Sequence, residues 1–221
     1  MGGVRYDGLA EWYDGWRPEL SPDELAALMR LLGTGDGRCL DVGCGTGVAT
    51  AVVAELGWSA VGVDVSAELL ARARARGIEA VEASAHSLPF EDASFDAATS
   101  VWTHTDVGDF RATVAEVARV LRPGAPFVYI GGHPCFVGPH SLFVHAEGTP
   151  TFHPGYRPSR RYDGTAPGVG DPEGLRARVG ARHLTLQDFI TAFTGAGLRI
   201  ERFEELGDRD YPYLVALRAR R

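Results

Sequence analysis

Three glycines occupy alternate positions in residues 40–47, which read LDVGCGTG and complete an apolar run. Because glycine weakens helices and strands, this spacing needs a physical reason, and the usual one is the close approach of a ligand to the backbone. Gly43 and Gly45 permit a tight turn, and the helix predicted to follow offers free N–H groups to a negatively charged group. Asp41 either contacts the same ligand or caps that helix.

A second acid, Asp64, ends the next predicted strand. A carboxylate at that place in an open α/β sheet can accept hydrogen bonds from both hydroxyls of a ribose. A nicotinamide enzyme would carry Gly or Ala at the sixth position counted from Gly43, but that position is Val48. The loop reads D-x-G-x-G-x-G instead, so a different nucleoside-containing cofactor fits better.

Two histidines are candidate general bases. His104 and His133 follow the fourth and fifth predicted strands, so both should lie on the ligand-binding edge of the sheet. Histidine can take up a proton near neutral pH, although a structural or substrate-shaping role is equally ordinary. Cys44 has a small side chain suited to burial beside the glycine loop rather than to redox chemistry. No cysteine or histidine spacing matches a zinc site, so no metal is expected.

Strands and helices alternate along most of the chain. The hydrophobic pattern predicts helices at residues 46–57, 66–77, 110–124 and 184–197, and strands at 38–43, 59–65, 78–83, 94–101, 125–132, 198–205 and 211–220. This alternation predicts an α/β fold, a Rossmann-like three-layer sandwich with a mostly parallel, seven-stranded sheet. The last two strands are joined by a short segment, so the final strand should be antiparallel.

Two regions interrupt the alternation. Residues 1–33 should form an N-terminal helical cap, in which SPDE at residues 21–24 matches a capping box. Residues 133–184 hold five of the seven histidines and seven of the thirteen prolines. A segment this long with little periodicity is usually a lid or binding loop, and we expect it to line the acceptor site within a single domain of residues 1–221.

The side chains of this insertion suggest what it could bind. Arg157, Arg160 and Arg161 could clamp a carboxylate or phosphate, although a solvated loop is the more ordinary interpretation. The aromatic residues expected to roof the acceptor site are Phe136, Phe143, Phe152, Tyr156 and Tyr162.

Three further stretches resemble motifs of the class I S-adenosylmethionine-dependent methyltransferases, in the order in which that family carries them. YDGLAEWYDGW at residues 6–16 resembles the family's N-terminal element. ASAHSLPFEDASFDAATSVWTHTDV at 83–107 resembles its third-strand loop and fourth strand, and EVARVLRPGAPFVYIG at 116–131 its next helix and strand. With the glycine loop, the resemblance covers about residues 5–131.

The resemblance implies S-adenosylmethionine as the cofactor. Its methionine part would lie at the glycine loop, its ribose at Asp64, and its adenine beside Val65 and position 84, where the family usually carries Asp and this chain has Ser. The methyl donor would face the residues that follow the fourth strand. The implied cofactor-binding residues are Tyr13, Asp41, Gly43, Cys44, Gly45, Gly47, Asp64, Val65, Ser84, Ala85, Val101 and Trp102.

The amino-acid composition narrows the classes of molecule that the protein is expected to bind. The formal net charge of −7 points away from nucleic acid, and no apolar run is long enough for a membrane span. The odd number of cysteines, three, and the absence of a visible secretion signal predict a cytoplasmic protein. The oligomeric state is left open.

The sequence therefore predicts methyl transfer to an O or N atom of a small-molecule acceptor, mainly by proximity and orientation. Two alternatives remain open at this point. One is an enzyme that retains the cofactor and catalyses a different reaction, such as a cyclisation. The other is a cofactor-binding regulatory module without catalysis.

Overall fold

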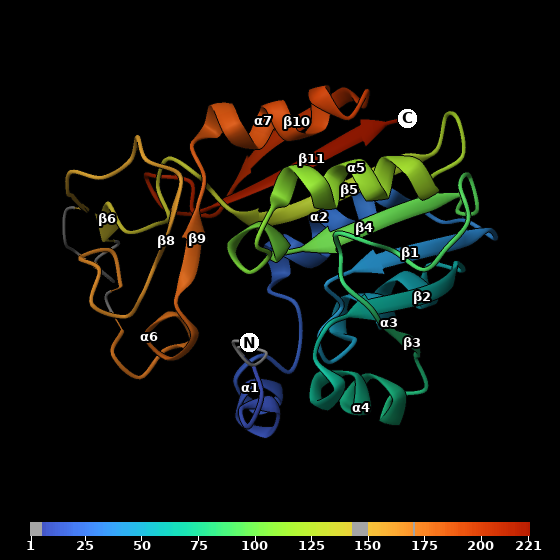
Figure 1. Cartoon of the computed structure of the whole chain (residues 1–221), viewed down its shortest axis with the longest axis horizontal. Coiled ribbons are helices and arrows are strands. Elements are labelled where there is room, and N and C mark those ends of the chain that lie inside the picture. The colour runs from blue at the N-terminus through green and yellow to red at the C-terminus, as the bar shows by residue number, and fades with distance from the viewer. Residues whose placement is uncertain (1–5, 143–149, 170) are drawn as a thin grey trace.

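A seven-stranded mixed sheet forms the centre of the computed structural model, which describes residues 6–142, 150–169 and 171–221 (Figure 1). The strand order is β10-β11-β5-β4-β1-β2-β3. The strands are β1 (Arg38–Val42), β2 (Ser59–Asp64), β3 (Glu79–Glu82), β4 (Ala97–Val101), β5 (Pro126–Gly132), β10 (Arg199–Leu206) and β11 (Leu214–Arg220).

Strand directions agree with the expected topology. β1 pairs in parallel with both β2 and β4, whereas β11 is antiparallel to β5 and to β10. The order of the strands therefore reverses between β1 and β4, and ligands of open α/β sheets bind beyond the carboxyl ends of the strands at such a point. The predicted Rossmann-like class and the antiparallel last strand are confirmed.

The helices begin where the sequence offers capping side chains. They are α1 (Ala10–Trp16), α2 (Pro22–Leu32), α3 (Val48–Glu55), α4 (Ala67–Ala75), the 3-10 helix η1 (Thr103–Thr105), α5 (Phe110–Val120), α6 (Leu175–Val179) and α7 (Leu186–Gly195). Ser21 caps α2 and exchanges bonds with Glu24 in the predicted capping box. Ser66, Asp109 and Thr185 each accept a backbone N–H at the start of α4, α5 and α7.

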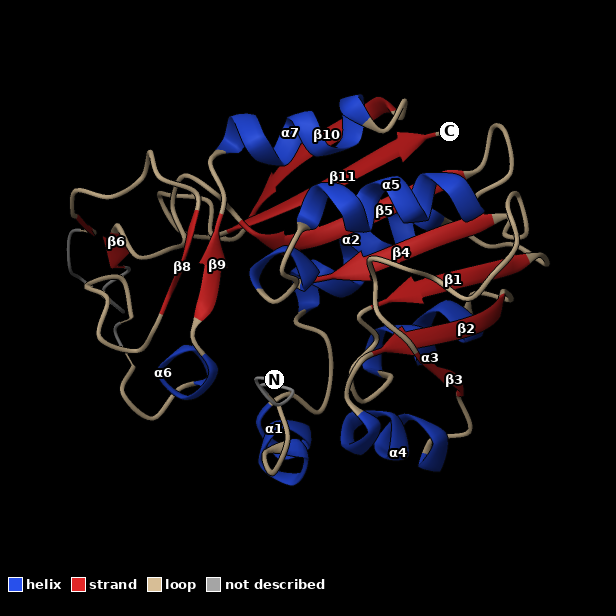
Figure 2. Cartoon of the chain, in the orientation of Figure 1, coloured by secondary structure: helices blue, strands red, loops and turns tan. Residues whose placement is uncertain are grey.

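Successive side chains along a strand point to opposite faces of the sheet and pack against different layers of helices. On β5, Phe127 and Tyr129 face the layer of α5 and α7, while Val128 and Ile130 face the layer of α2 and α3. Figure 2 shows α5 and α7 together in front of the sheet, with α2 and α3 behind it. The sheet is thus covered on both faces, which is why nearly every residue of its central strands is buried.

The insertion contains more regular structure than its sequence predicted. β6 (Ser141–Leu142) pairs with β7 (Thr151–Phe152), and β8 (Arg160–Tyr162) pairs with β9 (Ala181–His183), next to the short helix α6. These strands have two or three residues each, too few for a periodic pattern to be read from sequence. Figure 1 shows this segment beyond the left-hand ends of β4 and β5. Phe143 and His145 lie outside the described residues.

No helix in the described part of the chain is both long enough and apolar enough to span a membrane.

His104 lies in the core and not at the ligand-binding edge where the sequence placed it. Within η1 its ring packs against Phe110, Tyr129 and Phe189. Its Nδ1 shares a hydrogen bond with the Tyr129 hydroxyl, and only 3% of the residue is exposed. Burial, and then the positive charge of Arg176, lowers the pKa of His104 to about 3. The expected position is thereby corrected, and the placement gives no support to a general-base role.

The neutral burial of His104 predicts a pH effect on stability. Between pH 3 and about 6.5 the unfolded chain binds a proton on this residue that the folded chain does not. The free energy of unfolding should therefore decrease as the pH falls below about 6.5, by up to about 1.4 kcal/mol per pH unit from this group. His104→Gln should make the decrease between pH 6 and 4 shallower in urea unfolding experiments.

The matched control is Val53→Ala, which removes a buried apolar contact on the opposite face of the sheet and no titratable group. That variant should be less stable at every pH but keep the acid dependence of the original chain. Equal slopes in the original chain and in His104→Gln would contradict a neutral, buried His104.

Candidate functional site

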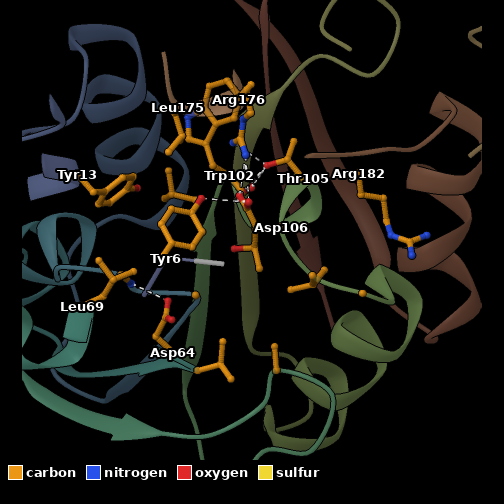
Figure 3. Close-up of a pocket in the computed structure, with 18 of the residues that line it drawn as sticks. Tyr6, Tyr13, Asp64, Leu69, Trp102, Thr105, Asp106, Leu175, Arg176 and Arg182 are labelled. Carbon is orange, nitrogen blue, oxygen red and sulfur yellow. Dashed lines mark hydrogen bonds and ion pairs between the residues drawn. The ribbon is translucent and has the colours of Figure 1, made fainter. Parts of the chain in front are cut away.

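A cavity of about 730 Å³ opens at the carboxyl ends of the parallel strands. Three parts of the chain line it: the N-terminal cap, the loops after β1, β2, β3 and β4, and the insertion. Figure 3 shows Tyr13 and Asp64 on one side of the cavity and Arg182 on the other. The topology therefore places the predicted cofactor residues and the insertion around a single space.

The glycine loop has two different functions in this structure. Gly43 and Gly45 line the cavity with positive φ angles of 73° and 54°. A Cβ at Gly45 would meet only the Tyr13 ring, at 3.8 Å, so open space lies beside this backbone. Gly47 does not line this cavity: at φ 83° it begins α3, and a Cβ there would lie 3.1 Å from side-chain atoms of both Ala73 and Ile78.

Asp64 presents its carboxylate at the end of β2, on the cavity wall. Oδ2 accepts a hydrogen bond from the Gly45 N–H at 3.0 Å, and Oδ1 accepts one from the Ser66 N–H at 3.0 Å. Burial raises the pKa of Asp64, and these backbone donors oppose the shift. A carboxylate has about four lone-pair positions, so acceptor capacity remains for the hydroxyls of a ligand.

Asp41 occupies a more enclosed environment at the end of β1. Thr50 and Thr99 donate hydrogen bonds to its two carboxylate oxygens at 2.6 and 3.0 Å. Burial raises the pKa of Asp41 to about 6. The residue lines a small recess of about 30 Å³ that it shares with Tyr13 and Cys44. Burial likewise raises the pKa of the Cys44 thiol, which therefore stays protonated and unreactive.

The remaining predicted cofactor residues all line the cavity. Val65, Ser84 and Ala85 lie beyond β2 and β3, and Val101 and Trp102 lie at the end of β4. Trp102 has a left-handed backbone, with φ 66°. Its indole N–H donates to Glu24, which also pairs with Arg17 at 2.7 Å. This contact fixes the N-terminal cap to the end of β4.

An ion pair that sequence reasoning missed joins all three parts of the cavity wall. Arg176 of α6 lies 3.0 Å from Asp106, which follows η1, and donates to the Thr105 hydroxyl at 2.9 Å. The Tyr6 hydroxyl donates to the same carboxylate at 3.0 Å, as Figure 3 shows. Burial opposes the charge of Arg176, but Asp106, Tyr6 and Tyr162 together raise its pKa, so it remains protonated.

His133 follows β5 but does not line the cavity. Its Nδ1 accepts the Cys135 N–H at 3.1 Å, so the proton is on Nε2, which donates to Glu205 at 2.9 Å. Burial lowers the pKa of His133, and Glu205 acts in the opposite direction. With both ring nitrogens bonded within the protein, this side chain stabilises the start of the insertion.

Of the insertion residues highlighted by the sequence, the structure brings two to the cavity, Arg161 and Tyr162. Phe136 and Phe152 pack with Tyr211, and Tyr156 packs with His140 and His183. Arg182 and Asp171 line the cavity although neither was singled out in the sequence. Within the described residues, no cluster of histidine, cysteine or carboxylate side chains could hold a metal ion.

These residues fit S-adenosylmethionine. The half-buried carboxylate of Asp64 suits the ribose, the open backbone at Gly45 leaves room beside it, and Val65 and Ala85 offer apolar contacts to an adenine. The recess at Asp41 suits a positively charged amino group, which would favour the ionised carboxylate.

Comparison with known proteins agrees with this assignment. Residues 40–129 match the family model of the methyltransferase domain. The chain is 37% identical over 128 residues to a demethylmenaquinone methyltransferase from Mycolicibacterium paratuberculosis, covering 56% of each protein. It is 42% identical over 97 residues to one from Mycobacterium sp. strain KMS, covering 44% of this chain and 42% of the relative. The chain thus spans only about half the length of the curated relatives it matches.

Structural similarity extends over the whole chain. A crystal structure of an S-adenosylmethionine-dependent methyltransferase from Mesorhizobium loti matches with a TM-score of 0.71 and 28% identity, covering 99% of this chain and 100% of the other. The domain match, the curated relatives and this full-length structural match all make the chain similar to S-adenosylmethionine-dependent methyltransferases, the family whose motifs its sequence resembles.

Proposed function

We propose that the chain transfers a methyl group from S-adenosylmethionine to an O or N atom of a small-molecule acceptor. One observation carries this proposal: the glycine loop and Asp64 share a single cavity with the insertion. Donor and acceptor can therefore bind side by side, within a volume of about 730 Å³. The cofactor supplies a sulfonium-activated methyl group, so the protein's task is chiefly to position the acceptor and exclude water.

The proposed cofactor contacts follow the cavity wall. Asp64 accepts hydrogen bonds from the ribose, Val65 and Ala85 pack against the adenine, and Ser84 bonds its polar edge. At the other end, Tyr13 and Asp41 enclose the methionine part in the small recess. The backbone of Gly43, Cys44 and Gly45 lines this path, while Gly47 supports it by packing α3 against α4.

Positioning rather than proton abstraction is the mechanism that the side chains favour. Neither His104 nor His133 lines the cavity, and His86, which does, accepts the Asp109 N–H on its Nε2. Burial raises the pKa values of Tyr6 and Tyr13, so both keep their protons at neutral pH. Trp102 and Tyr13 form apolar walls near the expected methyl position, and the insertion covers the opposite side. An acceptor that loses its proton readily needs no further base.

A small molecule is the acceptor class that the comparisons support. The curated relatives are named for demethylmenaquinone, a small molecule, and the net charge of −7 disfavours nucleic acid. The cysteines are free, so we place the enzyme in the reducing cytoplasm.

The direct test follows the methyl group. The purified chain, incubated with S-adenosylmethionine labelled in the methyl group and a panel of small-molecule acceptors, should yield a labelled product and S-adenosylhomocysteine. Conversion of an acceptor without transfer of label would replace the proposal by a cofactor-retaining reaction such as cyclisation. Cofactor binding with no conversion across the panel would favour a regulatory module.

The ribose contact can be tested by binding alone. Asp64→Ala should lose at least one charge-assisted hydrogen bond to the ribose, worth about 1.5–3 kcal/mol. Its affinity for S-adenosylhomocysteine, measured by calorimetry, should therefore be about tenfold lower or more. Glu79→Ala, which changes an exposed acid at the start of β3, should bind like the original chain. Equal affinities of all three proteins would remove Asp64 from the cofactor site.

His133→Gln tests whether a base is needed. If His133 only supports the insertion, turnover should change by no more than a few fold, and its pH profile between 6 and 8 should be that of the original chain. A general base would instead contribute about 10²-fold or more. A loss of that size with unchanged cofactor affinity would restore the catalytic assignment.

A further inference from the structure

Two arginines face each other on the insertion side of the cavity. Arg161 of β8 and Arg182 of β9 are directly opposed in the antiparallel ribbon, and both line the cavity. Like charges at directly opposed positions destabilise a strand pair. The ribbon therefore carries a local repulsion that a bound anion would relieve.

The other arginines of the cavity already have acidic partners. Arg17 pairs with Glu24 at 2.7 Å, and Arg176 pairs with Asp106 at 3.0 Å. Within the described ranges, neither Arg161 nor Arg182 forms an ion pair, and Arg161 donates a hydrogen bond to the Val179 carbonyl at 3.3 Å. Both arginines thus line the cavity without an ion-pair partner among the described residues.

Asp171 is an acid that also lines the cavity, but its carboxylate bonds locally. Its Oδ1 accepts the Glu173 N–H at 2.9 Å, and the residue forms no ion pair with a described arginine. Its carboxylate is therefore engaged in the local turn that precedes α6.

The position of the arginine pair separates it from the cofactor's own carboxylate. Figure 3 shows Arg182 across the cavity from Tyr13 and Asp64, the residues proposed to enclose the methionine and ribose. The methionine end lies in the recess with Asp41, which neither arginine lines. An anion at Arg161 and Arg182 therefore belongs to the second ligand of the cavity.

We infer that the acceptor carries a carboxylate or phosphate group, which Arg161 and Arg182 bind. This inference rests on the proposed methyl transfer and names the chemistry of its acceptor. Guanidinium groups form paired hydrogen bonds with both anions. The apolar part of the acceptor would lie against Val137, Tyr162 and Leu175, which line the same cavity.

The test uses small probes of matched shape. Benzoate, phenyl phosphate and neutral benzamide are titrated into the protein loaded with S-adenosylhomocysteine, and binding is followed by ligand-observed NMR. At least one anion should bind better than benzamide, and the one that binds identifies the group as carboxylate or phosphate. Arg182→Gln and Arg161→Gln should each lower the affinity for that anion about tenfold or more, because each substitution removes charge-assisted hydrogen bonds.

Arg160→Gln is the matched control, because Arg160 is an exposed neighbour on β8 that does not line the cavity. It should leave the affinity of the anion unchanged. Anions that bind no better than benzamide, or a loss in Arg160→Gln equal to that in Arg182→Gln, would overturn the inference.

Calorimetry with S-adenosylhomocysteine separates this failure from failure of the proposed function. Unchanged cofactor affinity in the three variants shows that they are folded. Normal cofactor binding without anion binding rejects the anionic acceptor alone, whereas absence of cofactor binding in the original chain rejects the proposed function itself.

Discussion

The ion pair between Arg176 and Asp106 is the contact on which the shape of the cavity depends. It joins the insertion to the loop after β4, and the Tyr6 hydroxyl adds the N-terminal segment to the same carboxylate. Each of these segments is distant from the others in sequence, and this small polar cluster brings them to one point. Removing one partner of such a pair leaves a charge in a poorly solvated place, so the cluster favours one closed arrangement of the three segments.

The central fold could be predicted because its determinants are local. Apolar runs of five to seven residues gave β1, β2, β4 and β5, and capping residues such as Ser21 and Ser66 marked where helices begin. Alternation of strands and helices then left few possible topologies. The glycine loop and Asp64 were identifiable for the same reason, since each follows directly from its place after a strand.

Contacts between distant segments were beyond the reach of sequence reasoning. Nothing near Arg176 or Tyr6 in the sequence marks either as a partner of Asp106, because their pairing depends on the path of the insertion. The histidines show the opposite error. Position after a strand predicted both His104 and His133 at the ligand-binding edge, but η1 turns His104 into the aromatic core, and Glu205 of β10 engages His133. Their order along the chain is set by the sequence, whereas packing determines which way each ring points.

The packing of Gly47 bears on which glycines of this loop selection would retain during evolution. Its Cβ position is closed off by Ala73 and Ile78 and its φ is 83°, so a larger residue there would strain the contact between α3 and α4 whatever the chain binds. Gly45 borders open space, and its φ of 54° is the constraint that the fold itself places on it. A descendant that had lost its ligand would therefore keep glycine at 47 for both packing and backbone conformation, whereas at 45 the backbone conformation alone would favour it.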